Sequence, residues 1–162
     1  MSGMRRKDKE ITEKVVIEEI FRQNQVGRLG LAVDNAPYVV PMNFAYFNGN
    51  IYLHSHMDGT KMSYIKQNPR VCFEVDDGET VTGENPCDFS WNYKSAIAFG
   101  EARILESDEE RINALKIISD KYSFGKSKQI TPEVMGKNKH LMLVEIKIDK
   151  MTGKQSPAPA KD

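Results

Sequence analysis

Residues 38–61 carry the sequence YVVPMNFAYFNGNIYLHSHMDGTK, in which two apolar runs flank a short polar break. The first run covers residues 38–47 and the second covers residues 51–55. Between them stand Asn48 and Gly49, residue types that tolerate the positive φ angles of a two-residue hairpin turn. The pattern therefore predicts an antiparallel β-hairpin.

Outside this hairpin, short apolar runs alternate with segments of helical periodicity. We expect strands at residues 28–33, 71–75, 93–105 and 140–150. Helices are expected at residues 10–24, 60–67, about 107–122, and in a short segment from Thr131. Residues 76–88 are rich in Asp, Glu, Gly, Thr, Asn and Pro and predict a loop. Gly100 lies inside an expected strand and predicts a bulge or a close approach of two backbones.

This order contains no series of alternating strands and helices of the parallel type. It favours a mainly β fold, an antiparallel barrel that is closed or partly closed, with peripheral helices. Residues 1–151 are expected to form a single domain. Residues 152–162 include Ser, Pro and Ala in alternation and are expected to be a disordered tail.

Composition excludes several classes of protein. The chain of 162 residues has 23 basic and 23 acidic residues, so it lacks the cationic surplus of a protein that holds nucleic acid. No run approaches 18 apolar residues, which excludes a membrane-spanning helix, and no apolar segment follows the basic start, which argues against a secretory signal. Two cysteines make no disulfide framework, so the reducing cytoplasm is the expected location.

The end of the hairpin has the features of an anion site. His54 and Ser55 close a strand, and after Gly59 a helix begins with Thr60 and Lys61. The first amides of a helix have no intrahelical partner, and the helix dipole favours negative charge beside them. A hydroxyl and an ammonium group there suit a phosphate, although the glycine spacing of a Walker loop is absent. The alternative is an ordinary strand, turn and helix with a solvated lysine.

A second polar and aromatic segment covers residues 91–102. Trp91, Tyr93, Lys94 and Ser95 gather near the start of an expected strand, a combination that suits a flat, hydrogen-bonding ligand. The alternative is a strand whose aromatic residues cover the edge of the core.

Other kinds of chemical site have little support in the sequence. His54 and His56 point the same way if they lie in a strand, but no CxxC or HExxH spacing accompanies them. We therefore expect no metal site. The GxGxxG motif of dinucleotide-binding folds is also absent.

Taken in order, several segments resemble the FMN-binding split-barrel family related to pyridoxamine 5′-phosphate oxidase. Within that family the sequence is most similar to the Nim-type proteins of 5-nitroimidazole resistance. The resemblance covers nearly the whole chain, and it is carried by residues 4–11, 27–31, 38–44, 51–55, 59–61, 68–75, 93–100 and 152–154.

The resemblance implies a homodimer that binds FMN at the subunit interface. The strand beside the flavin ring would be formed by Val40, Pro41, Met42 and Asn43. The ribityl chain and phosphate would be held by His54, Ser55, Thr60 and Lys61. Further polar contacts would come from Lys94 and Ser95, where the family often has Arg in place of Lys94.

The resemblance also implies a reaction. A histidine at the position of His54 is expected near flavin and substrate, and an imidazole can donate a proton near neutral pH. We therefore expect an FMN-dependent oxidoreductase that reduces a small electron-poor substrate, such as a nitroaromatic or nitroimidazole compound. Two alternatives stay open: a flavin-binding protein without turnover, and a haem-binding split-barrel protein with a histidine ligand. Neither nucleic acid nor a membrane is an expected partner.

Overall fold

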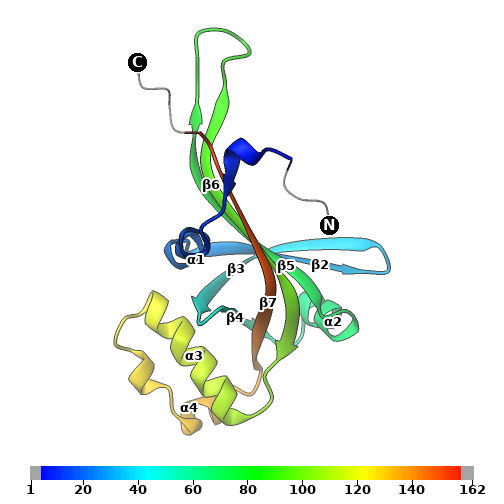
Figure 1. Cartoon of the computed structure of the whole chain (residues 1–162). Coiled ribbons are helices and arrows are strands. Elements are labelled where there is room, and N and C mark those ends of the chain that lie inside the picture. The colour runs from blue at the N-terminus through cyan, green and yellow to red at the C-terminus, as the bar shows by residue number, and fades with distance from the viewer. Residues whose placement is uncertain (1–4, 158–162) are drawn as a thin grey trace.

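The computed structural model describes residues 5–157, in which strands dominate (Figure 1). The expectation for the last residues of the tail, 158–162, lies outside the described residues. The strands are β1 (Glu10–Ile11), β2 (Val26–Val33), β3 (Ala36–Phe47), β4 (Asn50–His56), β5 (Arg70–Val81), β6 (Ser90–Ile104) and β7 (Leu141–Gln155). The α-helices are α1 (Lys14–Gln23), α2 (Thr60–Gln67), α3 (Asp108–Tyr122) and α4 (Pro132–Lys137). Two short 3₁₀ helices cover Lys7–Lys9 and Ser127–Gln129.

The strands form a closed antiparallel ring. Their order is β1-β7-β4-β3-β2-β5-β6, and β7 pairs with β6 as well as with β4. Residues 141–147 of β7 pair with β4, while residues 144–155 pair with β6 across a single register shift. The helices lie outside the ring (Figure 1). The predicted mainly β, antiparallel barrel with peripheral helices is confirmed.

Local sequence signals explain where the main turns and helices begin. Asn48 and Gly49 have φ angles of 47° and 81°, so the predicted hairpin joins β3 to β4. Helix α2 has the bounds expected from the sequence, residues 60–67. At the start of α3 the Ser107 hydroxyl accepts a hydrogen bond from the Glu110 amide, as the capping pattern indicates. The sequence did not predict the hairpin between β2 and β3, which turns at Asp34 and Asn35, both with positive φ.

The core has two parts. Inside the ring, Phe21 of α1 and the strand residues Phe44 and Phe73 are fully buried, with the Phe44 and Phe73 ring centroids 4.8 Å apart. Outside the ring, α3 and α4 cover the outer face of β3, β4 and β7. Burial of Ala114 and Ile118 against that face fixes α3 beside the end of β4.

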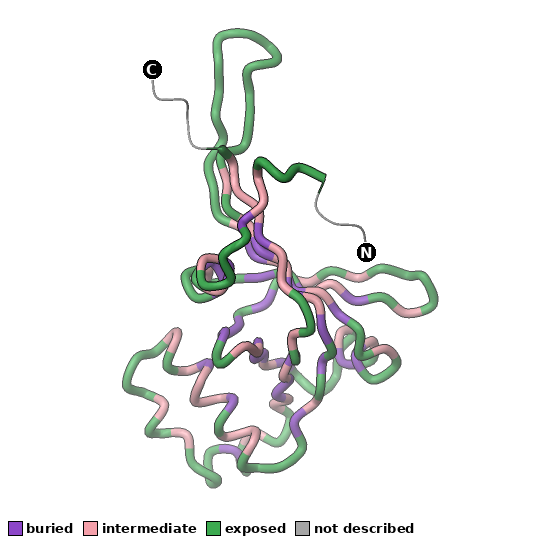
Figure 2. The backbone as a smooth tube through the Cα atoms, viewed as in Figure 1, coloured by how far each residue is buried: buried purple, intermediate pink, exposed green. Residues whose placement is uncertain are grey.

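The prediction of a loop over residues 76–88 is wrong for its first half. Strand β5 continues to Val81 and pairs with β6 as far as Ser90, so the two strands form a hairpin arm that projects from the barrel (Figure 1). Most of the arm is exposed (Figure 2), and its strands therefore lack the apolar alternation by which a half-buried strand is recognised. We call residues 76–95 the β5–β6 arm.

Both ends of the domain also differ from expectation. Residues 10–11 form strand β1 rather than the start of a helix, and they pair with Lys154 and Gly153. Strand β7 reaches Gln155, four residues past the expected domain end at residue 151. The Ser156 amide then donates to the Tyr93 carbonyl at 2.8 Å. Residues 152–156 are ordered because β1 and β6 supply backbone partners that a tail composition does not reveal.

No helix within residues 5–157 is long and apolar enough to cross a membrane.

Gly100 provides a test of ring closure. The register of β6 against β7 shifts between Phe99 and Gly100, and a Cβ atom on Gly100 would lie 2.0 Å from the Lys147 carbonyl oxygen. The predicted bulge and close approach are therefore confirmed. Because backbone must move to admit a methyl group, we expect Gly100→Ala to lower the free energy of unfolding by about 2–4 kcal/mol in urea titrations. The control is Gly136→Ala in α4, where nothing lies within 4 Å, and a gain of about 0.5–1 kcal/mol is expected. Equal effects of the two substitutions would contradict this account.

Candidate functional site

A cavity of about 420 Å³ lies where β3 and β4 meet the beginnings of α2 and β7. Six residues singled out from the sequence line it, namely Pro41, Met42, Asn43, His54, Ser55 and Lys61. Three further residues complete the lining, namely His56, His140 and Leu141.

Strand pairing explains why these side chains meet. Adjacent residues of a strand point to opposite faces, so Phe44 enters the core while Asn43 remains exposed. On β4, His54 is paired with Leu143 of β7 and His56 with Leu141. The register of β4 against β7 thus places the beginning of β7 beside the two histidines of β4.

The beginning of α2 gives one end of the cavity a positive character. Gly59 precedes the helix, no side chain caps it, and its first turn contains no acidic residue. The Met62 and Ser63 amides donate to the Gly59 carbonyl at 3.0 and 3.2 Å, so the amides of Thr60 and Lys61 are the ones available to a ligand. Lys61 is half-buried in the cavity wall, and no carboxylate in residues 5–157 lies within ion-pair distance of its ammonium group. Uncapped amides and an unpaired ammonium group together favour an anion.

His54 has a buried nitrogen without a partner. Its Nδ1 atom is inaccessible to solvent and makes no hydrogen bond within the part of the chain that the structure describes. Burial lowers the pKa of the imidazole below its ordinary value, and the nearby Lys61 charge lowers the pKa further. His54 is therefore neutral at neutral pH, and a neutral imidazole can accept or donate a hydrogen bond according to its tautomer.

All three histidines of the chain line this cavity. The His56 and His140 rings stack with centroids 5.2 Å apart and an interplanar angle of 28°. The Nδ1 atom of His56 accepts a hydrogen bond from the Asp58 amide at 3.2 Å. Sequence reasoning missed His140, because its position depends on the register of two strands that are distant in the chain.

The other four predicted residues lie elsewhere. Val40 is half-buried and packs against the core inside the ring, and Thr60 is exposed at the start of α2. Lys94 and Ser95 lie on the arm strand β6, where Lys94 is paired with Gln155 at the far end of β7. The cavity lies at Leu141, the opposite end of the same strand, so one chain does not bring Lys94 to it.

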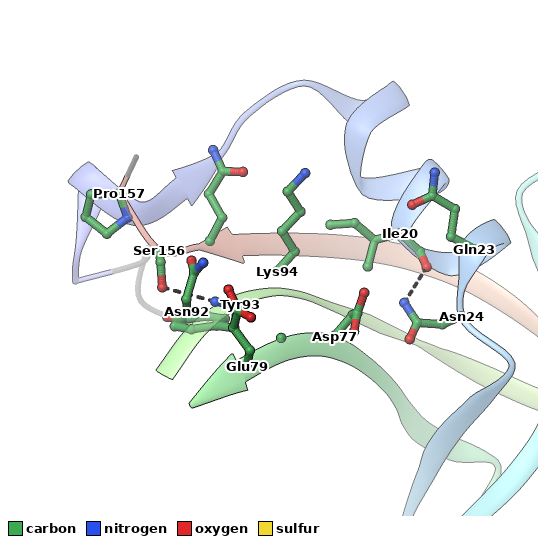
Figure 3. A pocket seen from close by; sticks show the side chains of 12 residues that line it. Ile20, Gln23, Asn24, Asp77, Glu79, Asn92, Tyr93, Lys94, Ser156 and Pro157 are labelled. Atoms are coloured by element: carbon green, nitrogen blue, oxygen red, sulfur yellow. Dashed lines mark hydrogen bonds between the residues drawn. The ribbon is translucent and has the colours of Figure 1, made fainter. Parts of the chain in front are cut away.

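Lys94 lines a different hollow of about 600 Å³ at the base of the β5–β6 arm (Figure 3). The end of α1 forms one wall, and the strand residues Asp77, Glu79 and Asn92 lie nearby. Ser156 closes the hollow, with its hydroxyl donating to the Trp91 carbonyl at 2.9 Å.

Within residues 5–157, no cluster of three or more His, Cys, Asp or Glu side chains could hold a metal ion.

Comparison with known proteins identifies the family. The sequence model described as pyridoxamine 5′-phosphate oxidase matches residues 13–155. The chain belongs to the pyridoxamine 5′-phosphate oxidase family. The resemblance drawn from the sequence is therefore confirmed at the level of the family.

The chain is similar to the following three proteins. A solved structure of a candidate 5-nitroimidazole antibiotic resistance protein from Bacteroides thetaiotaomicron is 30% identical, with a TM-score of 0.74, covering 90% of this chain and 85% of that one. The FAD and heme binding protein from Mycobacterium smegmatis is 16% identical, with a TM-score of 0.83, covering 95% of this chain and 76% of that one. That likeness concerns the fold, and it confirms the split barrel. An uncharacterised protein of Rhizobium meliloti is 26% identical over 148 residues, which are 86% of this chain and 89% of that protein.

The coupling between Lys61 and His54 can be measured directly. We expect Lys61→Met to raise the pKa of His54, because the substitution removes one of the two causes that lower it. The pKa should stay below its ordinary value, since the imidazole remains buried. An NMR titration of the His54 ring protons gives both values, and Lys66→Met, an exposed lysine in the last turn of α2, is the control. An unchanged His54 pKa in Lys61→Met would show that the two groups do not interact.

Proposed function

We propose that the chain is an FMN-dependent oxidoreductase that reduces a small electron-poor substrate. The observation that carries this proposal is the cavity at the start of α2, which unites the uncapped helix amides, the unpaired Lys61 ammonium group and the neutral imidazole of His54. Membership of the pyridoxamine 5′-phosphate oxidase family and similarity to a candidate 5-nitroimidazole resistance protein support it.

The residues of the cavity suit the parts of FMN. The phosphate would lie against the first turn of α2, where Lys61 neutralises part of its charge. The residues Pro41, Met42 and Asn43 would flank the flavin ring at the exposed end of β3. The Ser55 hydroxyl, which donates to the His56 carbonyl at 3.1 Å, keeps its oxygen free to accept from the ribityl chain.

His54 would hold and donate a proton during the reaction. When bound, reduced FMN supplies the electrons. A nitro group that takes up two electrons and two protons becomes a nitroso group and releases water. His54 can hold one of these protons at Nε2, the ring nitrogen that is not buried. A phosphate beside Lys61 offsets the lysine charge, so the pKa of His54 rises when the cofactor binds and the imidazole is more readily protonated.

We further propose that a second copy of the chain completes the site. In one chain, Lys94 and the cavity lie at opposite ends of β7. The β5–β6 arm that carries Lys94 projects from the barrel, with Phe89 73% and Trp91 44% exposed (Figure 2). A homodimer would cover these aromatic side chains, and the arm of one copy would supply Lys94 and Ser95 to the cavity of the other.

Flavin binding tests the cofactor assignment. We expect the visible bands of FMN to remain with the wild-type protein through gel filtration. Lys61→Met should weaken FMN affinity at least about tenfold, because a charge-assisted contact with the phosphate is lost. The control is Lys66→Met, on the same helix but outside the cavity. A wild-type protein that ignores FMN would overturn the proposal, and a Soret band after haem addition that His54→Ala weakens would favour the haem-binding alternative.

A complementation experiment tests the shared site. Lys61→Met and Lys94→Met chains should each bind FMN weakly when alone. When the two are refolded together, a mixed dimer has one site with both lysines intact and one with neither. Random mixing should therefore restore tight binding at roughly a quarter of the sites. Titration of FMN fluorescence measures this fraction. No recovery in the mixture would show that Lys61 and Lys94 do not act on one cofactor from two chains.

A further inference from the structure

A second hollow, of about 320 Å³, lies directly beside the cavity, on its α3 side. It is lined by Asn43, His54, Leu115, Ile118, Ser119 and Tyr122. Asn43 and His54 also line the cavity, so their side chains separate the two spaces and contact both. None of the residues from α3 was singled out from the sequence as part of a site.

The wall formed by α3 is held in place by its last turn. The Tyr122 hydroxyl accepts a hydrogen bond from the Phe44 amide at 2.8 Å and lies 2.6 Å from the Gln25 carbonyl oxygen, to which it can donate. Lys121, which precedes Tyr122 in α3, donates a hydrogen bond from its ammonium group to the Asn24 carbonyl at 2.5 Å. These contacts join α3 to β3 and to the end of α1, so the hollow keeps its width without a ligand.

The same contacts decide which polar groups remain for a ligand. Tyr122 is occupied by backbone groups, and the Asn43 amide donates to the Gln25 carbonyl at 3.3 Å. Nδ1 of His54 is inaccessible, and its ring makes no hydrogen bond in the described chain, so Nε2 is the nitrogen that remains for a ligand. Leu115 is half-buried and Ile118 is buried, and together they supply an apolar wall. No side chain with a fixed charge lines the hollow.

We propose that this hollow is the substrate pocket of the flavin site and that it selects compact, uncharged aromatic compounds. This inference rests on the proposed function. The ring would pack against Leu115 and Ile118, and one polar substituent would reach His54. A volume of about 320 Å³ is at the small end of the range for ligand pockets, roughly 300–1,000 Å³, and suits a compact aromatic compound. The lack of a charged partner disfavours ionised substrates, because burying a charge costs free energy when no opposite charge pairs with it.

Filling the hollow is the decisive experiment. We expect Leu115→Phe to lower kcat/KM for 4-nitrobenzyl alcohol at least about tenfold, while the dissociation constant for FMN stays within about twofold. Leu115→Ala should raise the activity on 1-nitronaphthalene relative to 4-nitrobenzyl alcohol, because it enlarges the hollow and the bulkier compound gains more from the added space. The control is Asn113→Phe, which adds the same ring to α3 at an exposed position about 200° around the helix.

Binding can be followed without the cofactor. In FMN-free protein, 4-nitrobenzyl alcohol should shift the NMR signals of the His54 ring, and Leu115→Phe should abolish the shift while Asn113→Phe preserves it. Ser119→Leu also narrows this hollow, from a second position in α3. It replaces Leu115→Phe in both experiments if that variant does not fold.

The proposal is overturned if the wild type shows no His54 shift up to about 10 mM of the alcohol, or if both filling variants leave the shift and kcat/KM unchanged. Loss of FMN binding by the wild type would instead contradict the proposed function. The cofactor-free titration would still decide whether the hollow binds an aromatic compound.

Discussion

Hydrogen bonding along both edges of β7 is the constraint on which the rest of the structure depends. Residues 144–147 of this strand have β4 on one side and β6 on the other, and this double pairing closes the ring. Closure removes the free edges that an open sheet would present. It also carries the chain from the cavity at Leu141 to the base of the arm at Gln155. A displaced β7 would separate His140 from His56 and expose the core around Phe73.

Charge and burial act together in the cavity. The beginning of α2 and Lys61 make it attractive to an anion, while the same lysine and the burial of His54 keep the imidazole neutral. A phosphate bound to the start of α2 and to Lys61 would offset the lysine charge, and the pKa of His54 would then be lowered less. Cofactor binding and the protonation of His54 are thus linked through one ammonium group, and the protonation state of the histidine reports on occupancy of the site.

Helix α3 gives the site its second wall. It reaches that place because its apolar face covers β3, β4 and β7, and because Tyr122 satisfies the backbone of Phe44, which lies one residue beyond the pairing of β3 with the first residue of β2. A single hydroxyl thus replaces the missing neighbouring strand beside Asn43. The proposed cofactor cavity and the proposed substrate pocket therefore share Asn43 and His54 as their boundary. The far wall of the cavity comes from α2 and β7, whereas the far wall of the pocket comes from α3.

The sequence by itself determined the features that depend on neighbouring residues. Asn48 and Gly49 specify the hairpin, the bounds of α2 follow from Thr60 and the Asn68-Pro69 stop, and Gly100 marks the bulge. The grouping of Pro41–Asn43 with His54, Ser55 and Lys61 followed from the family resemblance, because these residues lie on consecutive elements. Tertiary structure alone decided that His140 stacks on His56, that α3 walls a second hollow, that the arm is paired and that Lys94 lies far from the cavity. The histidine stacking and the place of Lys94 depend on the register between strands far apart in the chain, and the periodicity of a single strand carries no record of which partner it meets. The paired arm is too exposed to show a strand pattern, and the place of α3 depends on its packing against the sheet.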